Sequence, residues 1–259
     1  MMSIAQKDLA NAALGLLDLT SLNDGDSDES IRALAQSAAT PFGAPAALCV
    51  YDRFLGAARA ELDRLGLKQV RLATVSNFPL GGSDIPAVVA EAKSQPGKGA
   101  DEVDVVFPWR ALIAGDRDIG ARLVAAVRAA LPAGTTLKVI IESGELAEPS
   151  LIRRASEISI ENGADFVKTS TGKVPVNATL EAAEIILGTI RSSGKPVGFK
   201  ASGGVRTVAD AGEYLALADK IMGKGWVTPQ TFRFGASGLL GDIKAVLSGG
   251  ASGNTGSGY

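Results

Sequence analysis

The stretch ADFVKTSTGK, residues 164–173, reads as a short buried strand that ends on a lysine and runs into a loop of small polar residues. Phe166 and Val167 have the aromatic and β-branched side chains that strands favour, and Lys168 follows them directly. An ammonium group in a core is costly unless it is paired or gives up its proton and becomes a nucleophile. The rest of the chain decides between these two uses.

Short β-rich runs of this kind alternate with longer helical patterns along the chain. Such alternation is typical of βα units around a parallel sheet. The expected strands are residues 16–19, 47–51, 70–75, 102–107, 137–142, 166–169, 197–201 and 232–236, and the clearest helical segments are residues 85–93, 118–130, 150–162, 180–192 and 208–218. The pattern favours a closed (β/α)8 TIM barrel, with an open doubly wound sheet as the alternative. An extra N-terminal helix over residues 4–14 should cap one end of the barrel.

Length and composition indicate one domain. The 259 residues, 46% of them hydrophobic, can bury a full core. We expect a single barrel domain over residues 1–248 and a flexible Gly/Ser-rich tail over residues 249–259. Because 26 basic residues nearly balance 28 acidic ones, neither nucleic acid nor an anionic membrane is expected as the main partner.

Three absences in the sequence narrow the function further. No apolar run approaches the ~20 residues of a membrane span, and the start of the chain lacks the pattern of a secretory signal. With Cys49 as the single cysteine, no intrachain disulfide can form, so a cytoplasmic protein is expected. The chain also has no histidine, so acid–base chemistry must use Lys, Asp, Glu or Tyr.

Strand alternation places ionisable side chains inside the expected barrel, where (β/α)8 enzymes carry their reactive groups. Lys168 ends the sixth strand, Lys200 in VGFKASGG takes the equivalent place on the seventh, and DEVDVVFP turns Glu102 and Asp104 inward on the fourth. Only about 1 free lysine in 2,500 is neutral at pH 7, and a second cation nearby favours the neutral amine. The pattern indicates Lys168 as a nucleophile whose pKa Lys200 lowers. A purely structural network of Lys168, Lys200 and Asp104 is equally compatible with the spacing.

Loops of small residues follow the last three strands: STGK (170–173), SGGVR (202–206) and GASG (235–238). Small side chains let backbone N–H groups approach an anion, and a helix beginning near Ser237 would direct its positive end toward it. Each glycine pair alone would be an ordinary tight turn, but three such loops in succession favour a phosphate site. Its candidate residues are Thr171, Gly172, Lys173, Gly203, Gly204, Arg206, Gly235 and Ser237.

The segments GADEVDVVFP, LKVIIESGEL, GADFVKTSTGK, VGFKASGGVRT and RFGAS, in this order, resemble the deoxyribose-phosphate aldolase family, most closely its long enterobacterial form that ends in tyrosine. The likeness extends from LLDLTSLND to the final residue. It implies a class I aldolase that reversibly cleaves 2-deoxy-D-ribose 5-phosphate to acetaldehyde and D-glyceraldehyde 3-phosphate in deoxynucleoside breakdown. The reaction would pass through a Schiff base, with no cofactor and no metal. The implied partners are the phosphosugar and small aldehydes, and a homodimer is allowed.

By this resemblance Lys168 is the Schiff-base lysine, Lys200 the second lysine and Asp104 the proton-transferring carboxylate. Asp18 and Thr20, in LDLTSL, are placed to bind sugar hydroxyls. Tyr259 would reach the active site on the flexible tail and assist proton transfer at the enamine carbon, unless the tail is a mobile end with no role.

The sequence leaves two interpretations open for each of two further residues, Lys138 and Cys49. Lys138, inward on the fifth strand, would pair with Asp104 or Asp18, or would lie at the wet lower end of the strand. Cys49 is read as a small core residue, with a thiol facing the pocket as the alternative.

The sequence also departs from the family pattern. Gly238 stands where relatives carry a second serine, and Ala201-Ser202 replaces the common Pro-Ala, which we expect to matter little. Pro96 and Gly97 should end the preceding helix early. Two rival functions stay open at this point: a different Schiff-base aldolase or transaldolase, and a non-catalytic phosphosugar-binding barrel.

Overall fold

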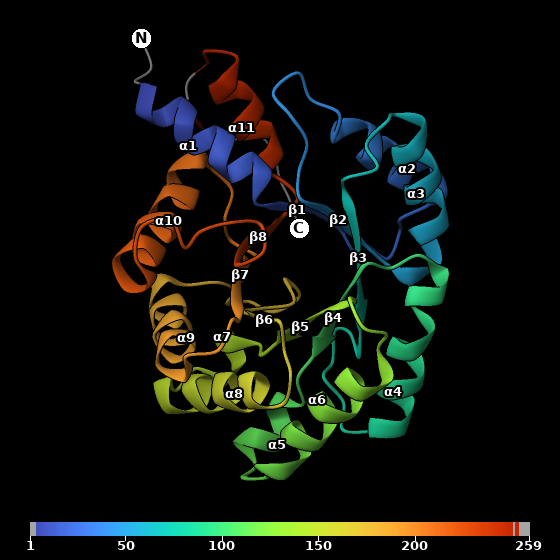
Figure 1. Cartoon of the computed structure of the whole chain (residues 1–259), viewed down its shortest axis with the longest axis vertical. Helices are drawn as coiled ribbons and strands as arrows, with labels where there is room; N and C mark the ends of the chain where they lie inside the picture. The colour runs from blue at the N-terminus through green and yellow to red at the C-terminus, as the bar shows by residue number, and fades with distance from the viewer. Residues whose placement is uncertain (1–3, 251, 254–259) are drawn as a thin grey trace.

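Eight parallel strands close into one barrel in chain order (Figure 1). The computed structural model describes residues 4–250, 252 and 253. Residue pairing between the last and first strands, with Asp18 opposite Gly235, completes the closure. The strands are β1 (Leu17–Ser21), β2 (Ala47–Val50), β3 (Arg71–Ser76), β4 (Glu102–Val106), β5 (Thr136–Ile140), β6 (Phe166–Lys168), β7 (Gly198–Ser202) and β8 (Phe232–Ala236). The predicted barrel is therefore confirmed, and the open sheet is excluded.

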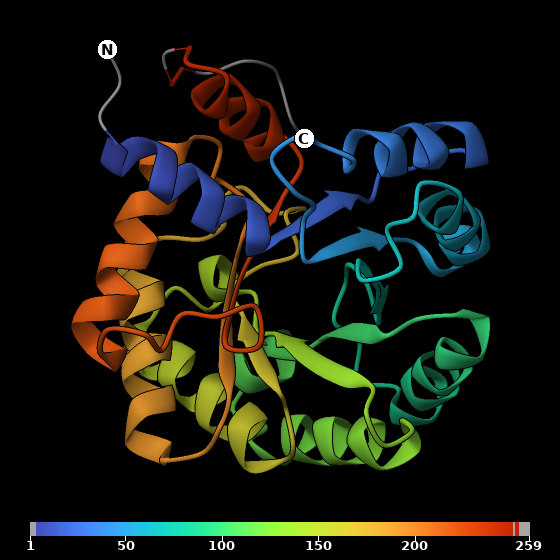
Figure 2. The ribbon, with the colours of Figure 1, turned by 45° about the horizontal axis from the view of Figure 1, so that its top comes forward.

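Helices surround the strands on the outside (Figures 1 and 2). They are α1 (Ile4–Gly15), α2 (Asp28–Ser37), α3 (Leu55–Arg64), α4 (Ile85–Ser94), α5 (Trp109–Ile113), α6 (Asp118–Ala130), α7 (Ser143–Leu146), α8 (Pro149–Glu161), α9 (Leu180–Ser193), α10 (Val208–Met222) and α11 (Leu239–Leu247), with short 3-10 turns η1 (Asp52–Phe54) and η2 (Pro96–Lys98). No helix in the described part of the chain is both long and apolar enough to span a membrane.

Local sequence explains where several helices begin and end. Thr207 caps α10 by accepting the Asp210 N–H, while the Asp210 side chain accepts the Thr207 N–H, which makes a reciprocal capping box. Thr179 caps α9 by accepting the Ala182 N–H. As predicted, α4 stops before Pro96, because a proline lacks the N–H that would continue the helix.

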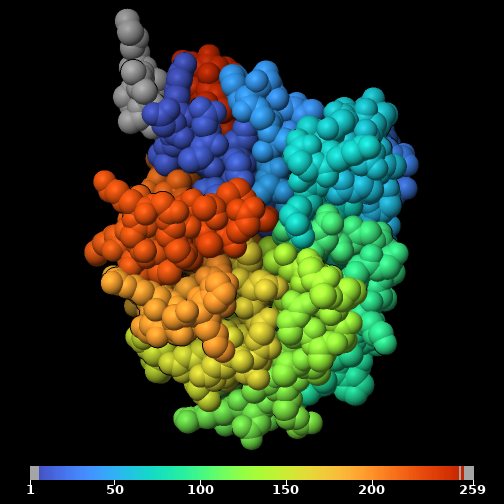
Figure 3. Space-filling model, in the orientation of Figure 1, coloured from blue at the N-terminus to red at the C-terminus, as the bar shows by residue number. Residues whose placement is uncertain are grey.

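The N-terminal helix does not cap an end of the barrel, so that expectation is wrong. Helix α1 packs beside α10 and α11 on the outside of the barrel, as Figures 2 and 3 show. Close packing explains this position: a Cβ added at Gly212 of α10 would lie 2.8 Å from a methyl carbon of Leu9. The small surface of α10 therefore accepts the apolar side of α1.

Two apolar regions flank the strands. The main core lies between the strands and the helices and includes Leu48, Val103, Phe199 and Phe234. A separate small cluster, Leu22, Cys49, Ala73 and Val75, packs with part of Tyr51 and Phe78. Cys49 pairs with Thr20 and Ala73 across neighbouring strands, so this small cluster belongs to the inner face of the barrel.

Candidate active site

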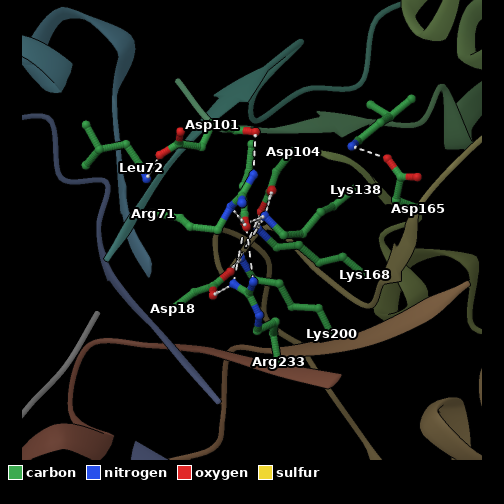
Figure 4. Close-up of polar contacts among 12 residues, drawn as sticks. Asp18, Arg71, Leu72, Asp101, Asp104, Lys138, Asp165, Lys168, Lys200 and Arg233 are labelled. Atoms are coloured by element: carbon green, nitrogen blue, oxygen red, sulfur yellow. Dashed lines mark hydrogen bonds and ion pairs between the residues drawn. The ribbon is translucent and has the colours of Figure 1, made fainter. Parts of the chain in front are cut away.

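The barrel register brings the inward ionisable residues of neighbouring strands side by side. Asp104 pairs with Lys138 across β4 and β5, and Lys168 pairs with Lys200 across β6 and β7. Lys200 pairs in turn with Arg233 on β8. Figure 4 shows these side chains pointing toward one another inside the barrel. Strand alternation, which the sequence displays, thus becomes a single buried polar cluster.

Asp104 is the centre of this cluster. Its Oδ1 accepts a hydrogen bond from Lys138 Nζ at 2.7 Å. Its Oδ2 accepts from both Lys168 Nζ and Lys200 Nζ, each at 2.9 Å. Asp104 and Lys200 are fully buried, and Lys168 keeps 3% of its surface exposed. Three of the four residues predicted as catalytic, Asp104, Lys168 and Lys200, therefore meet at one carboxylate oxygen of Asp104.

Two further buried carboxylates, Asp18 and Glu102, belong to the same network of ion pairs. Asp18 lies 2.5 Å from Lys200 Nζ and 2.6 Å from an Arg233 nitrogen. Glu102 lies 2.5 Å from Lys138 Nζ and 3.1 Å from Arg233, and it also contacts Arg71 at 2.8 Å. Both carboxylates are therefore fully engaged by cations. With Lys168 charged, the network would hold five cations, Arg71 included, against three carboxylates, so loss of the Lys168 proton reduces the excess of positive charge.

The pKa shifts separate Lys168 from its neighbours. Burial lowers the pKa of Lys168, and the nearby Lys200 cation lowers it further, against the opposing effect of Asp104. Burial also works against the charged form of Lys200, but Asp104 and Asp18 overcome it and raise the pKa of Lys200. Although burial favours the neutral acid, Lys138, Lys168 and Lys200 hold the pKa of Asp104 well below its usual range. Two adjacent lysines thus have pKa values shifted in opposite directions, and the neutral amine is favoured at Lys168 relative to Lys200.

The ion pairs show which of the two interpretations of Lys138, a paired lysine or a lysine at the wet end of the strand, is right. They also include Arg233, which was not predicted. Lys138 is fully buried and pairs with Asp104, and its distance to Asp18 is 3.7 Å. The alternative of a lysine at the wet end of the strand is therefore wrong. The sequence interpretation missed Arg233, although its place between Phe232 and Phe234 marks it as inward by the same alternation.

A cavity of about 440 Å³ opens at the ends of β6, β7 and β8. Seven of the eight residues predicted for the phosphate site line it, namely Gly172, Lys173, Gly203, Gly204, Arg206, Gly235 and Ser237. Asn23, in the loop after β1, also lines the cavity and was not predicted. Helix α11 begins at Leu239, directly after Ser237 and Gly238, which line the cavity. The helix therefore begins where an anion would gain from its N-terminal end.

Glycine is required in the cavity wall. Gly203 and Gly204 have φ values of +75° and +85°, a left-handed conformation that other residues adopt at a cost. A Cβ at Gly203 would also lie 2.7 Å from Asn177. Two consecutive left-handed glycines keep the loop after β7 narrow and its backbone accessible.

Thr171, the eighth predicted phosphate residue, lies deeper than the cavity wall. Its N–H donates to Oε1 of Glu142 at 3.0 Å, and its Oγ1 accepts the Lys173 N–H at 3.0 Å. Glu142 is fully buried with φ at +56°, and burial raises its pKa. The sequence interpretation missed Glu142, which lies two residues beyond the end of β5, where strand alternation no longer gives a signal.

The remaining predicted residues are placed as follows. The Thr20 hydroxyl donates to the Asp18 carbonyl at 2.8 Å. Cys49 is fully buried in the small apolar cluster opposite the lysines, and burial raises the pKa of its thiol. Tyr259 lies outside the described residues. Of the tail, Ser252 and Gly253 each donate a hydrogen bond to Asp242 of α11 at 2.8 Å.

A closed parallel barrel, with a charged network inside it and a small-residue cavity at the C-terminal ends of its strands, defines the class of (β/α)8 enzymes. Within that class, the DeoC/LacD family aldolase model matches residues 12–240. The chain belongs to this family, and it is an aldolase.

Solved structures agree with the family. A protein of Toxoplasma gondii ME49, provisionally named a deoxyribose-phosphate aldolase, has 25% identity and a TM-score of 0.87, over 96% of this chain and 97% of that one. A Coccidioides immitis protein with the same provisional name has 27% identity and a TM-score of 0.79, over 92% and 86%. The deoxyribose phosphate aldolase of Aeropyrum pernix, which is tetrameric, shares the fold at 24% identity and a TM-score of 0.73, over 94% and 92%.

Proposed function

We propose that this aldolase reversibly cleaves 2-deoxy-D-ribose 5-phosphate to acetaldehyde and D-glyceraldehyde 3-phosphate. One observation carries the proposal: Lys168, with a lowered pKa, lies at the inner end of a barrel whose mouth holds an anion-sized cavity lined by glycines, Lys173 and Arg206. An amine nucleophile and a phosphate site on neighbouring strands are what a phosphorylated aldehyde substrate requires.

In the forward direction, neutral Lys168 adds to the substrate carbonyl to form a carbinolamine, which loses water to give a protonated imine. Asp104 takes the proton of the hydroxyl on the third carbon of the sugar, while the imine draws the electrons of the bond between the second and third carbons, and that bond breaks. The third carbon leaves as the aldehyde of glyceraldehyde 3-phosphate, and an enamine stays on Lys168. Protonation of the enamine carbon and hydrolysis release acetaldehyde and restore the amine.

The proton transfers are assigned to Asp104 and Lys200. Asp104 Oδ2 lies 2.9 Å from both lysine nitrogens, so it can pass a proton between them without moving. The raised pKa of Lys200 favours its protonated form in the resting enzyme, so it can donate a proton through Asp104 and recover one later in the cycle. Tyr259 completes this proposal as the group that delivers a proton to the enamine carbon from the end of the tail.

At the other end of the substrate, the phosphate would occupy the cavity. Arg206 supplies a cation there, and the backbone of Gly204 and Gly235 lets N–H groups approach the anion. A Cβ at Gly238 would meet nothing within 4 Å. Gly238→Ser should therefore fit without strain and improve the affinity for phosphate by about 1 kcal/mol through one added hydrogen bond.

A comparison of two sugars tests the proposal. The enzyme should cleave 2-deoxyribose 5-phosphate to acetaldehyde, and Arg206→Ala should raise the KM for this substrate far more than the KM for unphosphorylated deoxyribose. Arg32→Ala, on the exposed surface of α2, is the control and should change neither. A preference for a donor other than acetaldehyde would indicate a different Schiff-base aldolase, and equal losses on both sugars would place the phosphate elsewhere.

A cytoplasmic location, expected from the sequence, and a homodimer, which the family resemblance allows, also belong to the proposal. Size-exclusion chromatography with light scattering measures the assembly directly. A tetramer, the state of the Aeropyrum pernix enzyme, would overturn the dimer and leave the reaction untouched.

A further inference from the structure

Three buried residues form the next layer of the barrel above the two lysines. Ile140, Lys168 and Lys200 are neighbours in the register of β5, β6 and β7. Glu142 and Ser170 lie two residues beyond the ends of β5 and β6, and Ser202 is the last residue of β7. We call these three residues the upper polar layer. Glu142 and Ser170 are fully buried, and Ser202 is 4% exposed.

Each residue of the upper polar layer has a polar atom without a protein partner. Glu142 Oε2, Ser170 Oγ and Ser202 Oγ are buried and make no hydrogen bond within the described residues. A buried unsatisfied polar group costs about 1–3 kcal/mol, so such groups are rare in folded proteins. Ten such atoms occur in the described residues, and these three lie together at the C-terminal ends of neighbouring strands, just beyond the two lysines, where an external molecule could complete their hydrogen bonds.

The layer lies between the lysines and the phosphate cavity. A Cβ at Gly235 would be 2.2 Å from Ser202 Oγ and 3.0 Å from Lys200 Cε, so the Ser202 hydroxyl packs beside Lys200 and against Gly235. Gly235 and Gly203, the residue after Ser202, both line the cavity. A molecule bonded to Lys168 with its phosphate in the cavity must therefore pass the upper polar layer.

We propose that Ser170 and Ser202, with Glu142 Oε2, bind the hydroxyl groups that the substrate carries between its imine carbon and its phosphate. The proposal rests on the function proposed above. It adds that the upper polar layer determines which aldehyde the enzyme accepts as the partner of acetaldehyde in the reverse reaction. Aldehydes with a hydroxyl beside the carbonyl gain a hydrogen bond that their deoxy counterparts lack. Ser202 replaces the alanine of the family pattern, so the proposal gives a function to a departure that was expected from the sequence to matter little.

Two matched acceptors test this role with acetaldehyde as donor: D-glyceraldehyde 3-phosphate, and 3-oxopropyl phosphate, which lacks only the hydroxyl. Ser202→Ala and Ser170→Ala should each lower kcat/KM for the hydroxylated acceptor by about three- to tenfold, the value of one hydrogen bond. The ratio of kcat/KM between the two acceptors should fall by the same factor. An unchanged ratio in both variants would overturn the proposal, because a layer that only holds water affects both acceptors alike.

Controls distinguish the loss of these hydrogen bonds from unfolding of the variants and from failure of the proposed reaction. Ser156→Ala removes another fully buried hydroxyl, which bonds the Ile152 carbonyl at 2.8 Å in α8, and should leave the acceptor ratio unchanged. Thermal unfolding verifies that each variant is folded. If the parent enzyme condenses acetaldehyde with neither acceptor, the proposed function fails. If the parent uses both and the two serine variants keep its ratio, only the upper polar layer fails.

Discussion

Lys168 and Lys200 stand directly opposite each other on β6 and β7 and donate hydrogen bonds to the same oxygen of Asp104, each at 2.9 Å. Their surroundings nevertheless differ, because Lys200 also contacts Asp18, whereas Lys168 contacts the shared oxygen. The pKa of Lys200 is raised and that of Lys168 is lowered. Two identical side chains are thus shifted in opposite directions, as the roles proposed for them require.

The first prediction concerns this pair. Lys200→Leu removes the cation that helps to lower the pKa of Lys168, so the pKa of Lys168 should rise. Since the neutral amine is the reactive form, the acid limb of the kcat/KM profile against pH should move to higher pH. Lys220→Leu, which alters an exposed lysine of α10, should leave the limb in place. An acid limb that does not move in Lys200→Leu would remove the role assigned to Lys200.

The second prediction concerns the stability of the inner network. Arg233→Met removes a buried cation that contacts both Asp18 and Glu102, which keep Lys200 and Lys138 as their remaining buried partners, and it should lower the free energy of unfolding by about 3–5 kcal/mol. Arg32→Met breaks an ion pair of α2 whose side chains are 52% and 58% exposed, and it should cost about 0.5 kcal/mol or less. Urea denaturation measures both. Equal costs would show that the Arg233 pairs contribute no more than surface pairs.

The third prediction concerns packing of α6 against the barrel. A Cβ at Gly120 would lie 2.2 Å from the ring of Phe107, so Gly120→Ala should destabilise the protein by about 1–3 kcal/mol despite the better helix propensity of alanine. Gly188 of α9 has nothing within 4 Å of the same position, and Gly188→Ala should stabilise it by about 0.5–1 kcal/mol. If thermal unfolding shows both variants gaining stability, the contact between α6 and Phe107 is looser than described.

The fourth prediction concerns the end of the chain. If Tyr259 supplies a proton to the enamine carbon, Tyr259→Phe should slow both turnover and the exchange of acetaldehyde methyl protons with heavy water, because the phenol provides the proton. The exchange is measured by NMR. Tyr214→Phe alters a buried tyrosine of α10 and should leave the exchange rate unchanged. Parent-like exchange and turnover in Tyr259→Phe would leave the tail without a role in proton transfer.

The part of the site that could be predicted from the sequence is the part that strand alternation determines. The inward positions of Lys168, Lys200, Asp104 and Lys138 follow from a period of two, and the register then sets the residues that meet. Alternation cannot say which carboxylate pairs with which cation, because that depends on closure of the barrel. The engagement of Asp18 by Lys200 and Arg233 therefore appears only in the structure.

Other features escaped prediction for local reasons. Helix α2 buries only Ile31 and Ala35, so its apolar stripe is too narrow to stand out. Glu142 adopts a left-handed backbone at the end of β5, where a simple strand pattern no longer describes the chain. The position of α1 depends on its contacts with α10 and α11, which lie more than 190 residues away in sequence. Such contacts leave no periodic signal.

Borohydride trapping tests the central claim, that Lys168 is the amine that bonds to the substrate, most directly. The enzyme is incubated with acetaldehyde, reduced with sodium borohydride, digested and analysed by mass spectrometry. We expect one irreversible ethyl group on the peptide that contains Lys168, none on Lys200 or Lys138, and none in the Lys168→Ala variant. An ethyl group on Lys200 in place of Lys168, or no adduct in the active parent enzyme, would contradict this account.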